Sequence, residues 1–166
     1  MSRPATSDHD RFRQALGHFA TGVTVVTALE DGEPVGFTCQ AFFSLSLEPP
    51  MVALAPAKAS TSWPRIARAG AFCVNVLGED QEEVGRAFAV SAATTDDKFA
   101  DVAWHPGTLG APVLDGCLAW VECEVGIAHD AGDHELVTGR VHDLGIGAGG
   151  PLLFYQGSYH RLEPHR

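Results

Sequence analysis

The sequence predicts a mainly β protein, an antiparallel sheet closed into a barrel, with two or three short α-helices. Apolar and polar residues alternate along residues 117–127, which is the period of a strand. Other apolar, β-branched runs are separated by turns that contain Gly, Pro or Asp. About six or seven such strands leave exposed edges unless the sheet closes, so a barrel is favoured.

Composition limits the possible functions. A chain of 166 residues suits one domain over 1–166, and we expect 1–10 to be flexible. The net charge of −10 argues against nucleic-acid binding and against acidic membranes. The N-terminus has no apolar segment and no apolar run is long enough to span a membrane, so we expect a cytoplasmic protein. The cysteines form no CxxC pair, which indicates reduced, buried thiols at Cys39, Cys73, Cys117 and Cys123.

The first part of the chain is expected to form one helix at residues 8–22. Three strands are expected to follow it, at residues 22–29, 34–47 and 50–57. The helix is indicated by four apolar residues at helical spacing, Phe12, Ala15, Leu16 and Phe19. Gly22 is a suitable end for this helix. The second strand contains an irregularity, because the small polar residues Thr38, Cys39 and Gln40 stand just before two phenylalanines.

The second part is expected to contain two helices, at residues 60–70 and 79–90, and one long loop at 91–107. Four strands are expected at residues 71–78, 116–130, 134–147 and 151–162. Pro64 is tolerated in a first helical turn. The strands at 116–130 and 134–147 form a hairpin around an Ala-Gly-Asp turn. Long loops in compact domains are often functional, which draws attention to 91–107.

Residues 55–64, APAKASTSWP, suggest an anion site. A strand ends there, small residues turn, and a helix begins, so free backbone N–H groups and the positive end of the helix dipole face the turn. Lys58 adds a charge, and Ser60, Thr61 and Ser62 add hydroxyl groups, which suits a phosphate. The alternative is that the Ser/Thr cluster only caps the helix.

Two further positions have both a structural and a functional interpretation. Lys98 lies among acidic residues in the long loop, where it is either a solvated lysine or a ligand contact. His134 begins a strand beside a glycine turn, and it either contacts a ligand or is a turn histidine stabilised by Asp133.

The sequence offers no protein-borne catalytic machinery. A metal site made of Cys117, Cys123, His129 and His134 is not favoured, because the spacing fits no structural zinc pattern. There is no GxSxG nucleophile motif, and no GxGxxG follows a strand and opens a helix, so a Rossmann dinucleotide site is not favoured. A small anionic ligand held by loops on a barrel, without acid–base or nucleophilic groups, is typical of enzymes in which a cofactor carries the chemistry.

Seven segments, taken in order, resemble the flavin reductase family with the FMN-binding, Greek-key split-barrel fold: FATGVTVVTA, GFTCQAFFSLSLEPP, FCVNVLGEDQEEVGRAFA, DKFADVAW, APVLDGCLAWVECEV, AGDHELVTGRV and PLLFYQGSYHRL. The resemblance runs from about Phe12 to Leu162. It implies a homodimer that uses NADH or NADPH to reduce FMN or FAD by direct hydride transfer. It also implies that the reduced flavin diffuses to a separate monooxygenase.

The resemblance also implies site residues. The Thr38–Ala41 stretch would wrap the flavin ring, Lys58–Thr61 would hold the phosphate, and the turn at Asp133 and His134 would lie near the nicotinamide. His134 would act in catalysis by positioning the nicotinamide or passing a proton. The full cofactor-binding set is Thr38, Cys39, Gln40, Ala41, Ala55, Lys58, Ser60, Thr61, Phe88, Lys98, Phe99, Asp133, His134 and Tyr159.

The sequence leaves several alternatives open. The family usually has hydroxyl or Asn side chains where this chain has Cys39, Gln40 and Ala41, so the side-chain contacts and the choice between FMN and FAD stay open. No arginine pair marks a 2′-phosphate site, which favours NADH over NADPH. A non-catalytic flavin- or haem-binding split barrel is the rival class. A flavoenzyme that keeps its FMN and acts on another substrate is the second rival.

Overall fold

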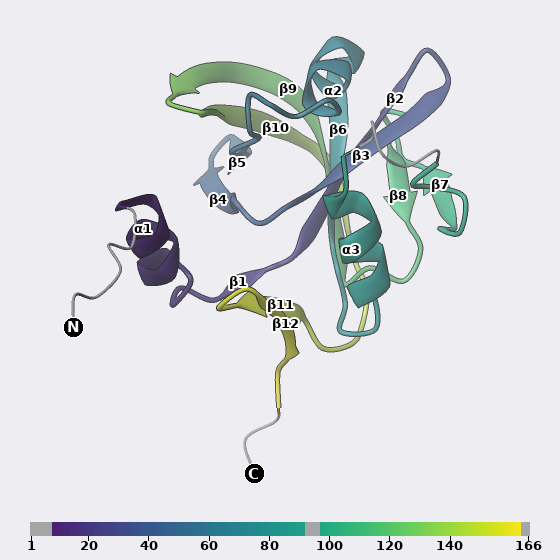
Figure 1. Ribbon diagram of the computed structural model, residues 1–166. Coiled ribbons are helices and arrows are strands. Elements are labelled where there is room, and N and C mark those ends of the chain that lie inside the picture. Colours follow the sequence, from purple (N-terminus) through teal and green to yellow (C-terminus); the bar gives the residue numbers. More distant parts are fainter. Residues whose placement is uncertain (1–7, 92–96, 164–166) are drawn as a thin grey trace, which may run out of the picture.

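The computed structural model describes residues 8–91 and 97–163 (Figure 1). The expected flexibility of residues 1–10 falls mostly on residues 1–7, which lie outside the described residues, as do 92–96 of the long loop. Asp8 already belongs to a helix. Strands dominate, the sheets are antiparallel, and three helices accompany them within the described part, so the predicted fold class is confirmed.

Seven strands form the main sheet, in the order β3-β2-β6-β9-β10-β5-β4. Their bounds are β2 Thr24–Glu30, β3 Glu33–Cys39, β4 Phe42–Leu47, β5 Pro50–Leu54, β6 Ala71–Val76, β9 Ala119–Ala131 and β10 His134–Ile146. The predicted hairpin at 116–147 is therefore present. The predicted strand at 34–47 is two strands, β3 and β4, because the chain turns at Gln40–Ala41.

The link between β3 and β4 explains why the sheet curls. These strands occupy the two opposite edges of the sheet order, yet only Gln40 and Ala41 separate them along the chain. Two residues span too little distance to cross a flat sheet of seven strands. The two edges must therefore come together at this turn, and Figure 1 shows the sheet strongly curled. The irregularity predicted near Gln40 is the split of the barrel.

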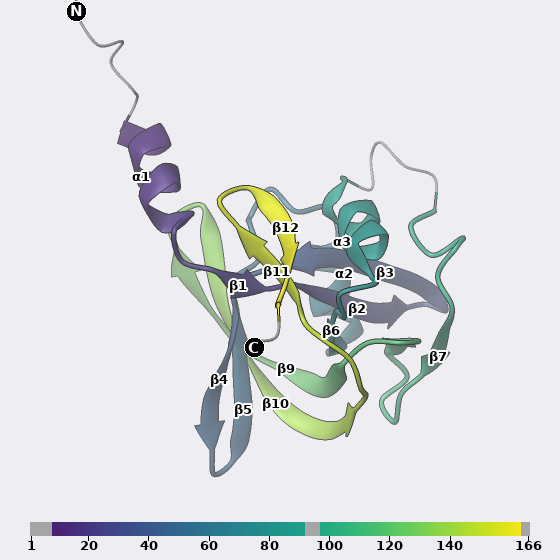
Figure 2. The same ribbon diagram turned by 90° about the horizontal axis from the view of Figure 1, so that it is seen from below.

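Two small sheets accompany the barrel. One consists of β1 (Thr21–Gly22), β11 (Leu152–Tyr155) and β12 (Ser158–Arg161), and it lies between α1 and α3 in Figures 1 and 2. The other pairs β7 (Trp104–Pro106) with β8 (Pro112–Leu114) on the flank of the barrel. The predicted closing strand at 151–162 is thus a hairpin, turned at Gln156–Gly157.

The three helices are α1 (Asp8–Leu16), α2 (Trp63–Ala69) and α3 (Glu82–Ala89). Ile66 of α2 and Phe88 of α3 are buried against the barrel. The expected helix over 8–22 is wrong in its end, since α1 stops at Leu16. It has no buried residue, and it stands apart from the barrel in Figures 1 and 2. No helix in the described part of the chain is both long and apolar enough to cross a membrane.

A buried polar network fixes β8 on the outer face of the sheet. The Asn75 side-chain amide donates to the carbonyl oxygens of Val25 (3.1 Å) and Pro112 (3.4 Å), and its oxygen accepts from the Leu114 N–H (2.8 Å). Glu122 is fully buried beneath the same segment, where its Oε1 accepts from the Ala111 N–H (3.1 Å). Most buried polar groups in proteins are hydrogen-bonded, so these contacts determine where residues 111–114 lie, although Glu122 Oε2 is buried without a partner among the described residues.

We expect Asn75→Leu to lower the free energy of unfolding by about 3 kcal/mol, because each buried group left without a partner costs about 1–3 kcal/mol. Urea denaturation followed by circular dichroism measures the change. Glu82→Gln is the control, since it affects only an exposed pair with Arg86 and should cost less than about 0.5 kcal/mol. Equal effects of the two substitutions would contradict the assignment of the network.

Candidate functional site

The turn at Gln40 and Ala41 presents backbone to solvent. Both residues are exposed, and their N–H groups have no acceptor among the described residues. The carbonyl oxygens, in contrast, are occupied: that of Gln40 accepts from the Phe42 N–H (2.9 Å), and that of Ala41 accepts from the Ala55 N–H (3.0 Å). The turn is therefore fixed by its acceptors while its donors stay available to a ligand.

The side chains just before the turn point into the protein. The Thr38 hydroxyl donates to the Gly85 carbonyl of α3 at 2.6 Å. Cys39 is buried in the barrel core, and burial raises the pKa of its thiol to about 11, so the thiol is neutral at pH 7. The structure thus places Thr38 and Cys39 as parts of the wall and leaves Gln40 and Ala41 at the rim.

Residues 55–61 begin at this rim and form a loop in which Pro56 is buried and Lys58, Ala59 and Thr61 are exposed. The Ala55–Ala41 hydrogen bond joins the loop to the turn. The Ser60 hydroxyl accepts from the Trp63 N–H (3.1 Å) at the start of α2, while the N-cap residue itself, Ser62, makes no side-chain capping bond. Thr61 is exposed, and its N–H has no acceptor among the described residues. The backbone donors that are available to a ligand therefore belong to the loop that precedes α2, a helix of seven residues.

The turn between β9 and β10 lies directly against this loop, although more than 70 residues separate the two in sequence. Ala57 forms a β-bridge with His134, and the Lys58 N–H donates to the Asp133 carbonyl at 2.9 Å. The Lys58 ammonium forms an ion pair with Asp130. The structure therefore brings together Lys58 and His134, which the sequence analysis singled out separately.

The Asp133 carboxylate orients the His134 ring. His134 Nδ1 lies 2.7 Å from Asp133 Oδ1, and this hydrogen bond is the main cause that lowers the pKa of Asp133. An ionised carboxylate only accepts, so Nδ1 carries the proton. Nε2 is then an acceptor while the imidazole is neutral, and it becomes a donor when the ring gains a proton.

A second group of predicted residues packs behind β3. The rings of Phe88 and Phe99 are buried and meet edge to face, with centroids 4.9 Å apart. Lys98 Nζ donates to the carbonyl oxygens of Phe88 (3.2 Å) and Gly36 (3.3 Å), and burial lowers the pKa of this ammonium. Lys98 is therefore bonded to the backbone of β3 and α3, and it supports β3 below the turn.

Tyr159 packs against the buried cluster that contains Phe88 and Phe99. It lies on β12, where the Arg86 guanidinium stacks on its ring at 4.8 Å. Partial burial raises the pKa of its phenol. Tyr159 therefore lies against Gly85 of α3, whose carbonyl oxygen accepts the hydrogen bond from the Thr38 hydroxyl.

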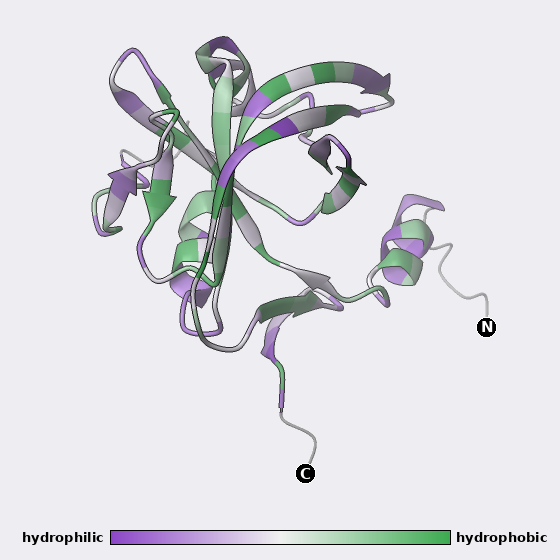
Figure 3. Ribbon diagram, turned by 180° about the vertical axis from the view of Figure 1, so that it is seen from behind, coloured by the Kyte–Doolittle hydropathy of each residue, from purple (hydrophilic) through white to green (hydrophobic). Residues whose placement is uncertain are grey.

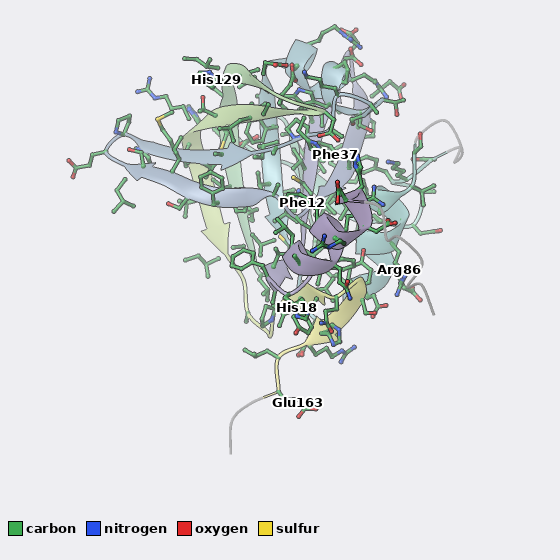
Figure 4. The ribbon with its side chains drawn as sticks, turned by 60° about the vertical axis from the view of Figure 1, so that its left-hand side comes forward. Phe12, His18, Phe37, Arg86, His129 and Glu163 are labelled. Carbon is green, nitrogen blue, oxygen red and sulfur yellow. The ribbon has the colours of Figure 1, made fainter. Side chains whose placement is uncertain are left out.

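A cavity of about 1060 Å³, which the sequence did not predict, opens beside the turn. Gln40 and Ala41 line one side of it, and Phe12 and Leu16 of α1 line the other. Figure 4 shows Phe12 on α1 and His129 near the tip of the β9–β10 hairpin. The helical spacing of Phe12 and Leu16 was visible in the sequence, but the cavity depends on how α1 is placed.

Known proteins are similar to this chain over most of its length. The chain matches the flavin reductase like domain family over residues 16–163. The reductase subunit HsaB of a flavin-dependent monooxygenase from Rhodococcus jostii is 48% identical over 160 residues, which cover 96% of this chain and 80% of HsaB. SmoA, an FMN reductase (NADH) from Agrobacterium fabrum, is 40% identical over 160 residues, covering 96% of this chain and 90% of SmoA.

A solved structure agrees as well. Nitrilotriacetate monooxygenase component B from Mycobacterium thermoresistibile superimposes with a TM-score of 0.90 at 47% identity, covering 95% of this chain and 88% of that one. This chain belongs to the flavin reductase like family, and the resemblance noted in its sequence is confirmed.

Proposed function

We propose that this protein is an NAD(P)H:flavin oxidoreductase, the reductase component of a two-component flavin-dependent monooxygenase. One observation carries the proposal: hydrogen bonds join the Gln40–Ala41 turn to the 55–61 loop, and that loop to the His134 turn. These are the segments that the family resemblance assigns to the flavin ring, the flavin phosphate and the nicotinamide. The names of HsaB and SmoA support the same activity.

The chemistry of the donors fits a flavin. The free N–H groups of Gln40 and Ala41 would meet the polar edge of the ring, where negative charge develops on reduction. Lys58, Ser60 and Thr61 would hold the phosphate of FMN or FAD, with the Thr61 N–H available to it. These groups lie in exposed loops, which suits a flavin that must leave after reduction.

His134 would position the nicotinamide. When bound, the flavin supplies the hydride acceptor, so the remaining task of the protein is to hold two ring systems in a near-attack geometry. With Nδ1 held by Asp133 and the side chain 45% exposed, Nε2 of His134 can accept a hydrogen bond from the nicotinamide carboxamide. NADH is the proposed donor, in line with the name of SmoA.

We expect NADH oxidation by gel-filtered protein to require added flavin. A spectrophotometric assay with and without FMN, FAD and riboflavin measures this and ranks the three flavins. A protein that stays yellow after dilution and oxidises NADH without added flavin would instead be a flavoenzyme with a retained cofactor. Binding without turnover would leave the non-catalytic binder.

We expect His134→Ala to lower kcat at least about tenfold and to leave flavin affinity nearly unchanged, because a lost positioning contact affects hydride transfer and not the phosphate loop. Stopped-flow reduction and fluorescence titration of FMN measure the two effects. The matched control is His129→Ala, on the same hairpin but five residues away. A normal rate in His134→Ala would remove His134 from the mechanism.

We propose that a second copy of the chain buries the exposed apolar side chains of α1 in a homodimer interface. Phe12, Leu16 and Phe19 are 66%, 58% and 78% exposed, and Figure 3 shows apolar residues on this isolated helix. The same chain exposes further large apolar residues at Leu47 (84%) and Ile146 (86%). Exposed apolar groups of this extent favour association, and a homodimer is what the family resemblance implies.

We expect Phe12→Asp to convert the dimer to a monomer, since a charge would have to be buried in the interface. Light scattering should give twice the 17.6 kDa chain mass for the wild type and the single mass for the variant. Phe12→Leu keeps the face apolar and should stay dimeric. A monomeric wild-type protein would refute the homodimer without touching the proposed activity.

A further inference from the structure

We propose that Trp63 and Glu135 are positioning residues that fix the phosphate loop at residues 55–61 relative to the His134 turn. The inference rests on the proposed function, and it names a pair that the sequence analysis did not single out. The pair connects the start of α2 to the start of β10.

The contact between the two side chains is direct. The indole N–H of Trp63 donates to Glu135 Oε2 at 2.8 Å. Trp63 is only 4% exposed, and its ring meets Phe72 of the barrel core edge to face, with centroids 6.5 Å apart. The indole is thus held by the core, and its N–H offers the Glu135 carboxylate one fixed direction.

Glu135 also holds the other end of the loop. Its backbone N–H donates to the Pro56 carbonyl at 3.0 Å. The loop leaves Pro56 and enters α2 at Trp63, so one residue of β10 bonds to both ends of it. Inside the loop, the Trp63 N–H donates to the Ser60 hydroxyl at 3.1 Å. Trp63 therefore contributes two donors, one to the loop and one to β10.

This arrangement couples the two proposed subsites. Lys58, Ser60 and Thr61 lie between the two tied ends, and His134 is the residue next to Glu135 in β10. Any shift of Glu135 relative to Trp63 would move the phosphate donors with respect to His134. A displaced phosphate loop would bind the flavin less tightly, which gives the pair a function beyond packing.

The carboxylate needs its partner for an electrostatic reason as well. Glu135 places a negative charge close to the proposed phosphate loop, where a free carboxylate would compete for the loop's donors. The Trp63 N–H engages Oε2 and keeps this group on the α2 side. Glu135→Gln retains an acceptor oxygen for the indole, so this variant separates the hydrogen bond from the charge.

The test compares Trp63→Phe, Glu135→Ala, their double variant and Glu135→Gln in the intact protein. We expect Trp63→Phe and Glu135→Ala each to raise the KM for FMN about tenfold while kcat stays within about twofold, the size expected for loss of one hydrogen bond to a charged acceptor. The double variant should be no worse than either single one, because the two side chains act as one unit. Glu135→Gln should resemble the wild type.

Glu30→Ala is the matched control. Glu30 accepts from Arg65 Nε (2.6 Å) and Arg68 Nε (2.7 Å), so this substitution loosens the same helix on its other side without touching the loop. It should lower Tm and leave the KM for FMN unchanged. A KM that stays normal in Trp63→Phe and Glu135→Ala, or one that rises equally in Glu30→Ala, would overturn the proposal.

Amide hydrogen exchange gives a second measurement that needs no flavin. The N–H groups of Lys58 and Ser60 are bonded within this region, to the carbonyl oxygens of Asp133 (2.9 Å) and Ala57 (3.0 Å). Both should exchange faster in Trp63→Phe and Glu135→Ala but not in Glu30→Ala; unchanged exchange would overturn the positioning role. If the wild type reduces no flavin, the proposed function fails, and this comparison still decides whether the pair fixes the loop.

Discussion

The structure depends on the two-residue connection between the opposite edges of its main sheet. Because only Gln40 and Ala41 link β3 to β4, the seven strands must curl until their edges meet. At that meeting point the side chains of Thr38 and Cys39 are used by the wall, one bonded to α3 and one in the core. The backbone N–H groups of the turn stay available, so closing the barrel also creates the rim of the candidate site.

The strand order then places the other two segments at the same rim. β5 pairs with β4 on one side and with β10 on the other, so the loop that leaves β5 lies beside the start of β10. The register that pairs Val137 with Leu54 continues into the bridge between Ala57 and His134. Segments that are distant in sequence therefore meet through sheet register, and the side-chain contact between Trp63 and Glu135 adds to that backbone framework.

Local sequence patterns predicted most of the strands. They did not predict which strands pair with one another or which segments cover the faces of the sheet. Alternation along 117–127 identified β9, because a strand's period is written in its own residues. The same alternation put Glu122 with the polar residues, yet Glu122 is fully buried because the connection between β7 and β8, at Gly107 and Ala111, covers that face from elsewhere in the chain. The spacing of Phe12 and Leu16 predicted a helix correctly. No local pattern, however, shows that every residue of this helix stays unburied in the folded chain.

The unusual residues at the turn are compatible with the proposed activity because the backbone, and not the side chains, supplies the donors. Cys39 stands where the family usually has a polar side chain, but it faces the barrel core, where a small apolar thiol packs well. Ala41 has no hydroxyl, yet its carbonyl still bonds to the Ala55 N–H and its own N–H still faces solvent. A site built from backbone in this way tolerates side-chain change as long as the turn keeps its shape.

The contacts that keep that shape lie behind the turn, in the Thr38 bond to α3 and in the Phe88–Phe99 cluster under β3. The shape of the turn therefore depends more on the residues that hold it than on the side chains of the residues that form it.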